Sequence, residues 1–183
     1  VEVAPTFAAF IFPLPVMETR EVCTCVAADV DLSAGQFANT VYVAWSDTTA
    51  PESNVNNNHG RIQLAFSRDG GATWTVRTPH ETADASTVDR FNPWLAVSTD
   101  GAVHVVFYDT RQDLPGRNQA DLFHSLSRDG GETWSTPERL TSVSSPNIAD
   151  GLEWGDYNGL SAVGQELVAM FTDNRDEAGG ENP

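Results

Sequence analysis

Three hydrophobic runs recur along the chain at a nearly constant interval. They are Val41 to Asp47, Val103 to Asp109 and Leu167 to Asp173, and each ends in an aromatic residue, one further residue and an aspartate. The final aspartates lie 62 and 64 residues apart. Apolar side chains on both alternating faces are typical of a β-strand that is covered on both sides by neighbouring sheets. The pattern therefore predicts three copies of one β-unit.

Shorter segments with strand patterning surround each hydrophobic run. An inner strand is expected before the run, a third strand after it and an outer strand last, but the third unit ends after its run. The expected inner strands are 22–30, 93–98 and 157–163, the third strands 61–67 and 121–127, and the outer strands 73–78 and 133–140. We therefore predict an all-β fold. It has a leading or closing segment at 1–20, one unit at 21–80, a second at 81–142 and half a unit at 143–183.

Two nearly identical turns join the third and outer strands of the first two units. Residues 67–74 read Ser-Arg-Asp-Gly-Gly-Ala-Thr-Trp, and residues 127–134 read Ser-Arg-Asp-Gly-Gly-Glu-Thr-Trp. The aspartate can accept hydrogen bonds from N–H groups of its own turn, and the glycines adopt positive φ without a Cβ clash. The residues that define the repeated turn are Ser67, Asp69, Gly71, Trp74, Ser127, Asp129, Gly131 and Trp134.

This turn resembles the Asp-box, or bacterial neuraminidase repeat (BNR), of sialidase-like β-propellers. The phrases at 91–97 and 155–160 are also similar to those of bacterial exo-α-sialidases and repeat-containing glycosyl hydrolases. The resemblance covers residues 21–176 and implies a partial propeller of about two and a half four-stranded blades. Since a closed propeller has roughly four to eight blades, the remaining blades would come from a longer chain or from a symmetry partner.

Strand alternation places the connections of each blade on two opposite faces. The turns between inner strands and hydrophobic runs share one face with the two Asp-box turns. The longer connections lie on the other, the long-loop face: 48–60, 79–92, 110–120, 141–156 and 175–183. Binding and catalytic residues are commonly carried by loops on a rigid scaffold. We therefore expect a glycan or a protein to bind at the long-loop face.

The charge of the chain excludes two classes of partner. Its formal net charge is −16, its sequence pI is near 4.3, and all ten basic residues are arginines. Nucleic acids and anionic membrane surfaces require cationic patches, so we expect neither as a partner. No window approaches the roughly 20 apolar residues of a membrane span. The resemblance to sialidases implies a secreted or cell-surface protein.

The resemblance also implies candidates for catalysis. Sialidases hold the substrate carboxylate with three arginines and use an aspartate as acid and base. Their nucleophile is a tyrosine, assisted by a glutamate, in place of the usual carboxylate. Glu153, Asp156 and Tyr157 cluster where the third unit begins. These three are the candidate catalytic residues.

Three arginines and one tryptophan are the candidate substrate-binding residues. Arg111 and Arg175 each lie two residues after a hydrophobic run, and Arg90 lies just before an inner strand. A guanidinium pairs bidentately with a carboxylate, so either an acidic sugar or aspartates of the chain itself would engage these side chains. Trp154 would serve either as a stacking platform for a sugar or as a core residue.

The aspartates of the hydrophobic runs have a structural alternative to catalysis. Asp47, Asp109 and Asp173 repeat at one position of the unit, which favours a structural role in bonding loop N–H groups. We expect no metal and no cofactor. The alternative is a Ca²⁺ ion shared through the carboxylate oxygens of Asp109, Asp113 and Asp121.

Histidine and cysteine pairs are the remaining candidates for chemistry. His104 and His124 lie on adjacent strands, and a packed or exposed pair is expected there rather than a metal site. Cys23 and Cys25 would face the same side of a strand, and a disulfide between them would close a very small ring. Two buried thiols are therefore expected, with a bridge to a segment outside the chain as the alternative.

Two classes of function stay open from the sequence. The first is a sialidase-like glycoside hydrolase, or part of one, that acts on extracellular glycans. The second is a non-catalytic repeat propeller that binds a glycan or a protein or serves as a surface scaffold. The exposed edge of the incomplete third unit also invites strand pairing. One candidate for the added strand is the segment 1–20 of a symmetry partner.

Overall fold

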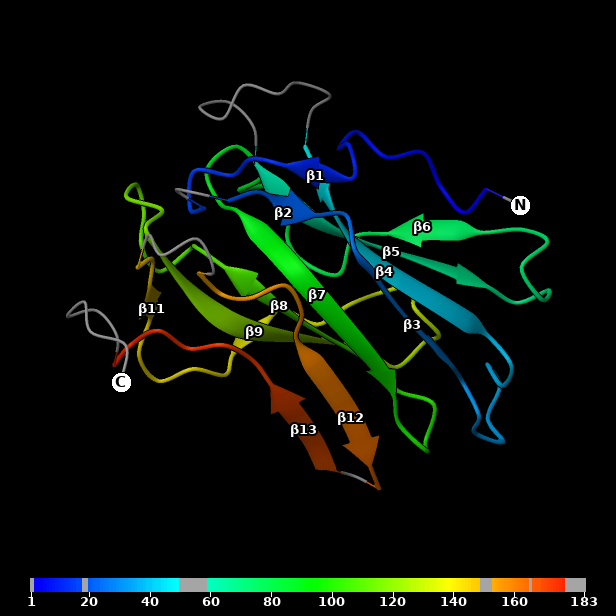
Figure 1. The fold of residues 1–183 in the computed structure, drawn as a ribbon. Coiled ribbons are helices and arrows are strands. Elements are labelled where there is room, and N and C mark those ends of the chain that lie inside the picture. Colours follow the sequence, from blue (N-terminus) through cyan, green and yellow to red (C-terminus); the bar gives the residue numbers. More distant parts are fainter. Residues whose placement is uncertain (1, 18–19, 50–58, 149–152, 165, 177–183) are drawn as a thin grey trace.

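Strands dominate the computed structural model, which describes residues 2–17, 20–49, 59–148, 153–164 and 166–176. These ranges contain thirteen β-strands and no helix, so the all-β prediction is confirmed. Two sheets with four consecutive strands each, a two-stranded sheet and a short N-terminal pair make up the fold (Figure 1). The described residues include no helix with the length and apolarity that a membrane crossing needs.

The first sheet is an antiparallel meander of four strands. They are β3 (Val26–Val30), β4 (Val41–Thr48), β5 (Gly60–Ser67) and β6 (Thr75–Arg77), paired in chain order. Seven of the eight residues of β5 are buried, whichever face they point to. Six of the eight residues of β4, which contains the hydrophobic run 41–47, are also buried, as the apolar patterning of that run predicts for a strand inside a stack of sheets.

The second sheet repeats this order. It consists of β7 (Arg90–Val97), β8 (Val103–Asp109), β9 (Gln119–Ser127) and β10 (Glu138–Arg139), and β11 (Ser145–Pro146) pairs with the start of β9. Every residue of β8 is buried. β10 is much shorter than the predicted outer strand 133–140.

The third sheet is a hairpin of β12 (Gly159–Val163) and β13 (Glu166–Met170). No other described strand pairs with β13, and its apolar residues Val168 and Met170 are 59% and 75% exposed. β13 ends three residues before Asp173, the predicted end of this run. A strand paired on one side only has fewer ladder bonds to hold its end.

The inner strand β7 is the centre of the fold. It contacts β3, β4 and β5 on one side and β12 on the other, as its central place in Figure 1 shows. One apolar cluster, which includes Tyr42, Leu64 and Phe107, fills the space between the first and second sheets. A second cluster packs the other face of the second sheet against the third sheet and the N-terminal segment.

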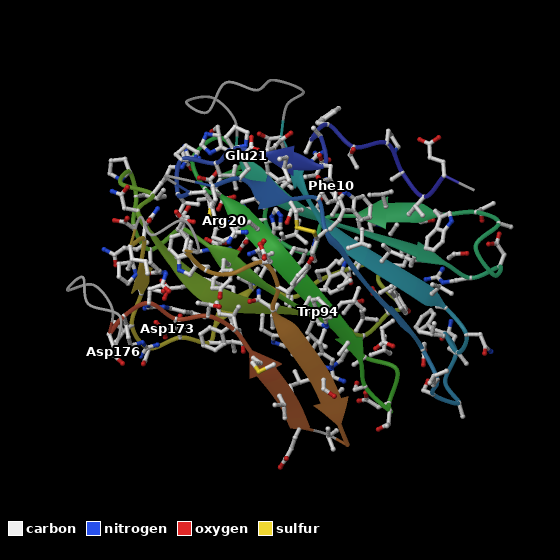
Figure 2. All side chains as sticks on the ribbon, in the orientation of Figure 1. Phe10, Arg20, Glu21, Trp94, Asp173 and Asp176 are labelled. Atoms are coloured by element: carbon white, nitrogen blue, oxygen red, sulfur yellow. A yellow bond between two sulfur atoms is a disulfide. The ribbon has the colours of Figure 1, made fainter. Side chains whose placement is uncertain are left out.

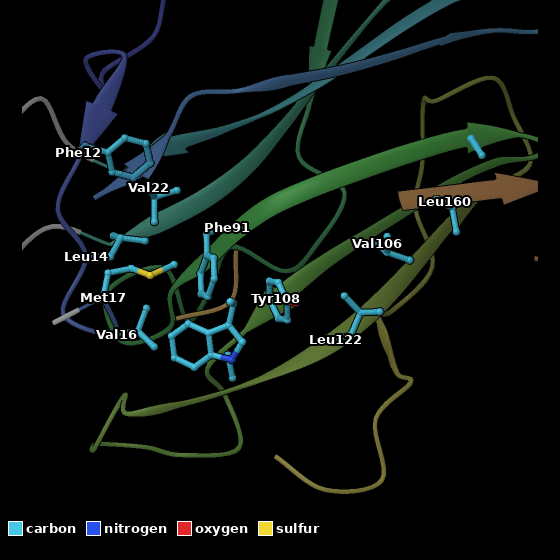
Figure 3. Close-up of a cluster of buried hydrophobic side chains, with 13 residues drawn as sticks. Phe12, Leu14, Val16, Met17, Val22, Phe91, Val106, Tyr108, Leu122 and Leu160 are labelled. Carbon is cyan, nitrogen blue, oxygen red and sulfur yellow. The ribbon is translucent and has the colours of Figure 1, made fainter. Parts of the chain in front are cut away.

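The N-terminal segment packs on its own chain. β1 (Ile11–Phe12) pairs with β2 (Val22–Cys23), and Leu14, Val16 and Met17 are buried in the second cluster. Figure 3 shows these side chains on the same side of the cluster as Phe91. The expectation that segment 1–20 serves a partner chain is therefore wrong for this structure, because releasing the segment would expose its apolar side chains.

The predicted inner strand 22–30 is interrupted between β2 and β3. The Thr24 N–H donates to the Phe10 carbonyl at 2.8 Å, and its hydroxyl donates to the Ala9 carbonyl at 2.6 Å. Cys23 and Cys25 form a disulfide with a Cα–Cα distance of 5.0 Å. The prediction of two buried thiols is wrong, because the break in the strand brings the cysteines to bonding distance and leaves both partly exposed.

The turn at 67–74 is closed by its own side chains. The Ser67 hydroxyl donates to Asp69 at 2.8 Å and accepts from the Gly71 N–H at 2.8 Å, and the Trp74 indole donates to the Gly71 carbonyl at 3.1 Å. Asp69 also accepts from the hydroxyl and the N–H of Thr73, and these hydrogen bonds lower the pKa of Asp69 to about 2.

The turn at 127–134 has the same hydrogen bonds. Ser127 donates to Asp129 at 2.9 Å, the Gly131 N–H donates to Ser127 at 2.9 Å, and the Trp134 indole donates to the Gly131 carbonyl at 3.2 Å. Arg68 of the first turn donates to the Gly130 carbonyl of the second. Both turns therefore lie on one face of the molecule.

Candidate functional site

The starts of the three inner strands meet at one pocket on the long-loop face. Figure 2 labels Arg20 and Trp94 in this region. Each inner strand begins at the long-loop face. Three segments that are distant in the sequence therefore converge there. The pocket is lined by Cys23, Cys25 and Val26 of the first unit, Asn92, Pro93 and Trp94 of the second, and Asp156 and Tyr157 of the third.

Asn92 joins its own segment to β4 of the first unit and to the third unit. Its N–H donates to the Ser46 hydroxyl at 3.1 Å and its side-chain amide donates to the Gly155 carbonyl at 3.2 Å. The Asn158 side chain donates to the Asn92 carbonyl at 2.6 Å. Asn92 has a φ of 48° and lies at a register shift in β7, which turns its polar groups toward both neighbours. This residue therefore positions the pocket.

The candidate catalytic residues lie at two depths. Tyr157 is 64% exposed and Asp156 is exposed beside it, and both line the pocket. Glu153 is buried, in a turn with a φ of 36°. The structure thus gathers the three residues in one segment, with a phenol and one carboxylate open to solvent and the other carboxylate enclosed.

Arg20 is a residue of this site that the sequence reasoning missed. Its guanidinium forms an ion pair with Asp156 and lies 3.9 Å from the Glu153 carboxylate. It comes just before the first inner strand, as Arg90 comes just before the second, and this equivalence was the available signal. Arg20 therefore links the exposed and the buried carboxylate.

Two of the candidate arginines converge on one aspartate of the hydrophobic run. Arg90 Nε and Arg111 Nη2 each lie 2.7 Å from Asp109 Oδ2. Arg90 also pairs with Asp84 at 2.6 Å, and Arg111 with Glu81 at 3.1 Å. The Arg90 side chain is fully buried, so its prediction as a substrate-binding residue is wrong for this arrangement. Arg111 keeps a partly exposed side chain.

Arg175 is the most accessible of the three candidate arginines. It donates to Asp173 through Nε at 2.6 Å, and about a third of its side chain is exposed. It lies on the same face as Arg111, in the equivalent position of the third unit. An acidic ligand that binds Arg175 would compete with Asp173 for a guanidinium at the surface.

Trp154 is part of the core. It is fully buried, its indole donates to the Ser145 hydroxyl at 2.9 Å, and its ring packs against Phe91 and Tyr108 at centroid distances of 5.6 and 6.2 Å. The alternative of a sugar-stacking platform is therefore wrong, because no face of the ring reaches solvent.

The repeated aspartates bond loop N–H groups, as their repetition predicts. Asp47 accepts from the N–H groups of Phe7 and Ala8. Asp109 accepts from the Arg111 N–H at 2.8 Å, and Asp173 accepts from the Arg175 N–H at 3.0 Å. Asp109 and Asp173 fix the chain just after their runs, whereas Asp47 holds the N-terminal segment against β4.

The aspartates considered for Ca²⁺ are engaged by other groups. Asp109 and Asp121 are register partners on β8 and β9. Asp109 pairs with arginines, Asp121 accepts from Arg139 at 2.7 Å, and Asp113 accepts from the Asn118 N–H at 2.7 Å. Within the described ranges, no group of three His, Cys, Asp or Glu side chains could hold a metal ion.

The two histidines of the second sheet meet. His104 Nδ1 lies 3.0 Å from His124 Nε2, and the two rings are stacked with centroids 5.2 Å apart. Burial, and next the nearby His124, lower the pKa of His104 to about 4. Burial also lowers the pKa of His124, and the 3.0 Å contact joins the two rings through one hydrogen bond.

Comparison with solved structures identifies the fold. A Hadza microbial sialidase, Hz136, is similar with a TM-score of 0.55 at 16% identity, over 82% of this chain and 29% of that protein. A Dyadobacter fermentans DSM 18053 protein of unknown function is similar with a TM-score of 0.41 at 16% identity, over 75% of this chain and 36% of that one. No protein-family model and no curated protein matches the sequence. The chain has a sialidase-like fold and spans less than a third of the sialidase it resembles.

Proposed function

We propose that the chain is part of a sialidase-like glycoside hydrolase that acts on acidic glycans outside the cytoplasm. The observation that carries this proposal is the exposed pair Asp156 and Tyr157 where three inner strands converge, with Glu153 enclosed in the same segment. The fold similarity to a sialidase supports it. The chemical roles are assigned from the side chains of Glu153, Asp156 and Tyr157 themselves.

In the proposed reaction Tyr157 is the nucleophile. A phenol is weakly nucleophilic unless a neighbouring base takes its proton, and Glu153 is assigned that role. Asp156 is assigned the role of acid and base toward the leaving group. Arg20 positions both carboxylates through its ion pair with Asp156 and its 3.9 Å approach to Glu153.

Arg111 and Arg175 are the proposed contacts for the carboxylate of an acidic sugar. Both are partly exposed on the long-loop face, and a guanidinium offers the planar fork that a carboxylate accepts. Binding would exchange a bond to Glu81 or Asp173 for a bond to the ligand. The net negative charge of the chain repels anions. Only a ligand whose carboxylate fits the guanidinium fork would therefore make this exchange.

The turns at 67–74 and 127–134 are proposed to be Asp-boxes with a structural role. The serine and aspartate side chains bond within their own turn, Arg68 joins the two turns, and the turns lie on the face opposite the candidate site. An extracytoplasmic location is supported by the disulfide, because disulfides persist in oxidising compartments. The remaining propeller blades are proposed to come from a longer chain, with a symmetry partner as the alternative source.

A non-catalytic propeller that binds glycans or proteins is the second candidate function. The pairing of Arg90 and Arg111 with Asp109, and of Arg175 with Asp173, favours it, because these arginines already have carboxylate partners. Such a protein would hold a glycan without cleaving it.

A glycan-release assay separates the two candidates. The full-length protein is incubated with sialylated and other acidic glycans, and the free sugar is measured beside glycan-array binding. Release that is lost in Tyr157→Phe and in Glu153→Gln supports the hydrolase. Binding without release by the wild-type protein supports the non-catalytic propeller and overturns the hydrolase.

A further inference from the structure

The disulfide between Cys23 and Cys25 does little to staple the fold. A single residue, Thr24, separates the two cysteines. A disulfide stabilises mainly by restricting the unfolded chain, and this effect is smallest for the shortest loops. Other contacts already hold the segment, since Thr24 bonds to Ala9 and Phe10 and since Cys23 pairs with Ile11 in the β1–β2 ladder. The bond therefore calls for a role other than stabilisation.

The disulfide is accessible to an attacking thiol. Both cysteines are partly exposed, and both line the pocket that also holds the exposed Tyr157. Thiol–disulfide exchange begins when a thiolate reaches one sulfur, so access to the sulfur governs its rate. Exposed disulfides are the labile, regulatory or catalytic ones, whereas structural disulfides resist reduction.

We propose that Cys23 and Cys25 form a thiol–disulfide exchange site whose substrate is a small neutral dithiol. A thiolate of the dithiol attacks one cysteine sulfur, the Cys23–Cys25 bond breaks, and the released cysteine thiolate takes up a proton. The second thiol of the dithiol then attacks the mixed disulfide. The dithiol leaves as a cyclic disulfide, oxidised by two electrons, and the protein gains two electrons and two protons as two thiols.

The charge around the pocket selects the substrate. Asp156 lines the pocket with an exposed carboxylate whose charge Arg20 balances, so the repulsion of anions comes from the whole chain, which carries a net charge of −16. An anionic monothiol such as glutathione is repelled by this field, whereas an uncharged dithiol is not. A dithiol also closes its own ring in the second step, which a monothiol cannot do without a second molecule.

Opening of the disulfide would change one wall of the pocket. The two cysteines lie where β2 passes to β3, and both line the pocket together with Trp94 and Tyr157. The exchange itself needs neither a glycan nor any of the proposed catalytic residues. The inference therefore stands or fails independently of the proposed hydrolase.

Alkylation of the native protein tests the proposal. The full-length protein is incubated with dithiothreitol or with glutathione at equal thiol concentration, quenched with acid and alkylated. The tryptic peptide 21–61, which contains both cysteines, is then measured by mass spectrometry. We expect two alkyl groups on this peptide after dithiothreitol, with an unchanged far-ultraviolet circular dichroism spectrum, and their loss after reoxidation with oxidised dithiothreitol.

The rate in the folded protein decides the outcome. We expect dithiothreitol to reduce the folded protein within about tenfold of the rate for the urea-unfolded chain, and glutathione to be at least about tenfold slower than dithiothreitol. A folded-state rate below that limit overturns the exchange site, and equal rates for the two reagents overturn the preference for a neutral dithiol. Cys25→Ser, which leaves one thiol without any reductant, calibrates the alkylation.

Discussion

Arg90 and Asp109 face each other as register partners across β7 and β8, and their side chains form a fully buried ion pair. The pair joins the first residue of one strand to the last residue of the next at the long-loop face. Asp109 also accepts from Arg111, so one enclosed carboxylate holds two arginines. This ion pair holds the start of β7 against the end of β8. Because Asn92 of the pocket lies on β7, the pair also helps to fix the pocket.

Removal of the charge of Asp109 is expected to destabilise the fold strongly. In Asp109→Asn the buried Arg90 keeps Asp84 but loses its fully buried carboxylate partner, which should lower the free energy of unfolding by about 3 kcal/mol. Urea unfolding measures the change. Asp173→Asn is the matched control, because its partner Arg175 is partly exposed, and a loss below about 1 kcal/mol is expected there. Equal losses would contradict the assignment of Asp109 as a structural anchor.

The two repeated turns provide a matched pair of glycines. Gly70 and Gly130 have φ values of 71° and 70°, but a Cβ at Gly130 would lie 2.6 Å from the Phe37 ring, whereas a Cβ at Gly70 meets nothing within 4 Å. Gly70→Ala should cost about 1–2 kcal/mol from backbone strain alone. Gly130→Ala should cost at least about 1 kcal/mol more through overpacking. Thermal unfolding of both variants measures the difference, and equal costs would mean that Phe37 moves freely.

Because its pKa is lowered in the folded state, His80 is expected to make the fold less stable as the pH decreases. Burial, and next the charge of Arg90, lower the pKa of His80 to about 3, so the folded state keeps it neutral while the unfolded state binds a proton below pH 6.5. Stability contributed by the neutral form is therefore present above pH 6.5 and is lost as the pH falls toward 3. The slope from this group approaches about 1.4 kcal/mol per pH unit.

Urea unfolding between pH 7 and 4 measures the His80 contribution. His104 and His124 also have lowered pKa values, so the informative quantity is the difference between wild type and His80→Gln. The variant should unfold with a shallower pH dependence than the wild type. Parallel curves would show that His80 is protonated in the folded state, against its Nε2 acceptance from the Ile62 N–H.

Much of the fold was predictable because its signals are local. The run from Val103 to Asp109 coincides with β8, and the turns at 67–74 and 127–134 close through hydrogen bonds among their own residues. Strand alternation and turn chemistry need no knowledge of distant contacts. The repeat of one unit then gives the order of the sheets.

The site was less predictable because its residues are placed by distant partners. The strand break at Thr24 depends on Phe10, and the burial of Trp154 depends on Phe91 and Tyr108. Arginine and tryptophan side chains serve equally well in cores and at surfaces, so residue type alone does not decide between them. Packing between units decided the place of Trp154, whereas Arg90 and Arg111 were placed by carboxylates of their own unit.

Turnover by Tyr157→Phe tests the central claim most directly, with Tyr108→Phe as the matched control in the full-length protein. Tyr108 is buried and exchanges two hydrogen bonds with Thr172, so its variant should lose about 1–3 kcal/mol of stability and keep its turnover number for a sialylated glycan. Tyr157 is exposed, so its variant should keep its stability and lose turnover by about 10³-fold. Unchanged turnover in Tyr157→Phe would contradict the account.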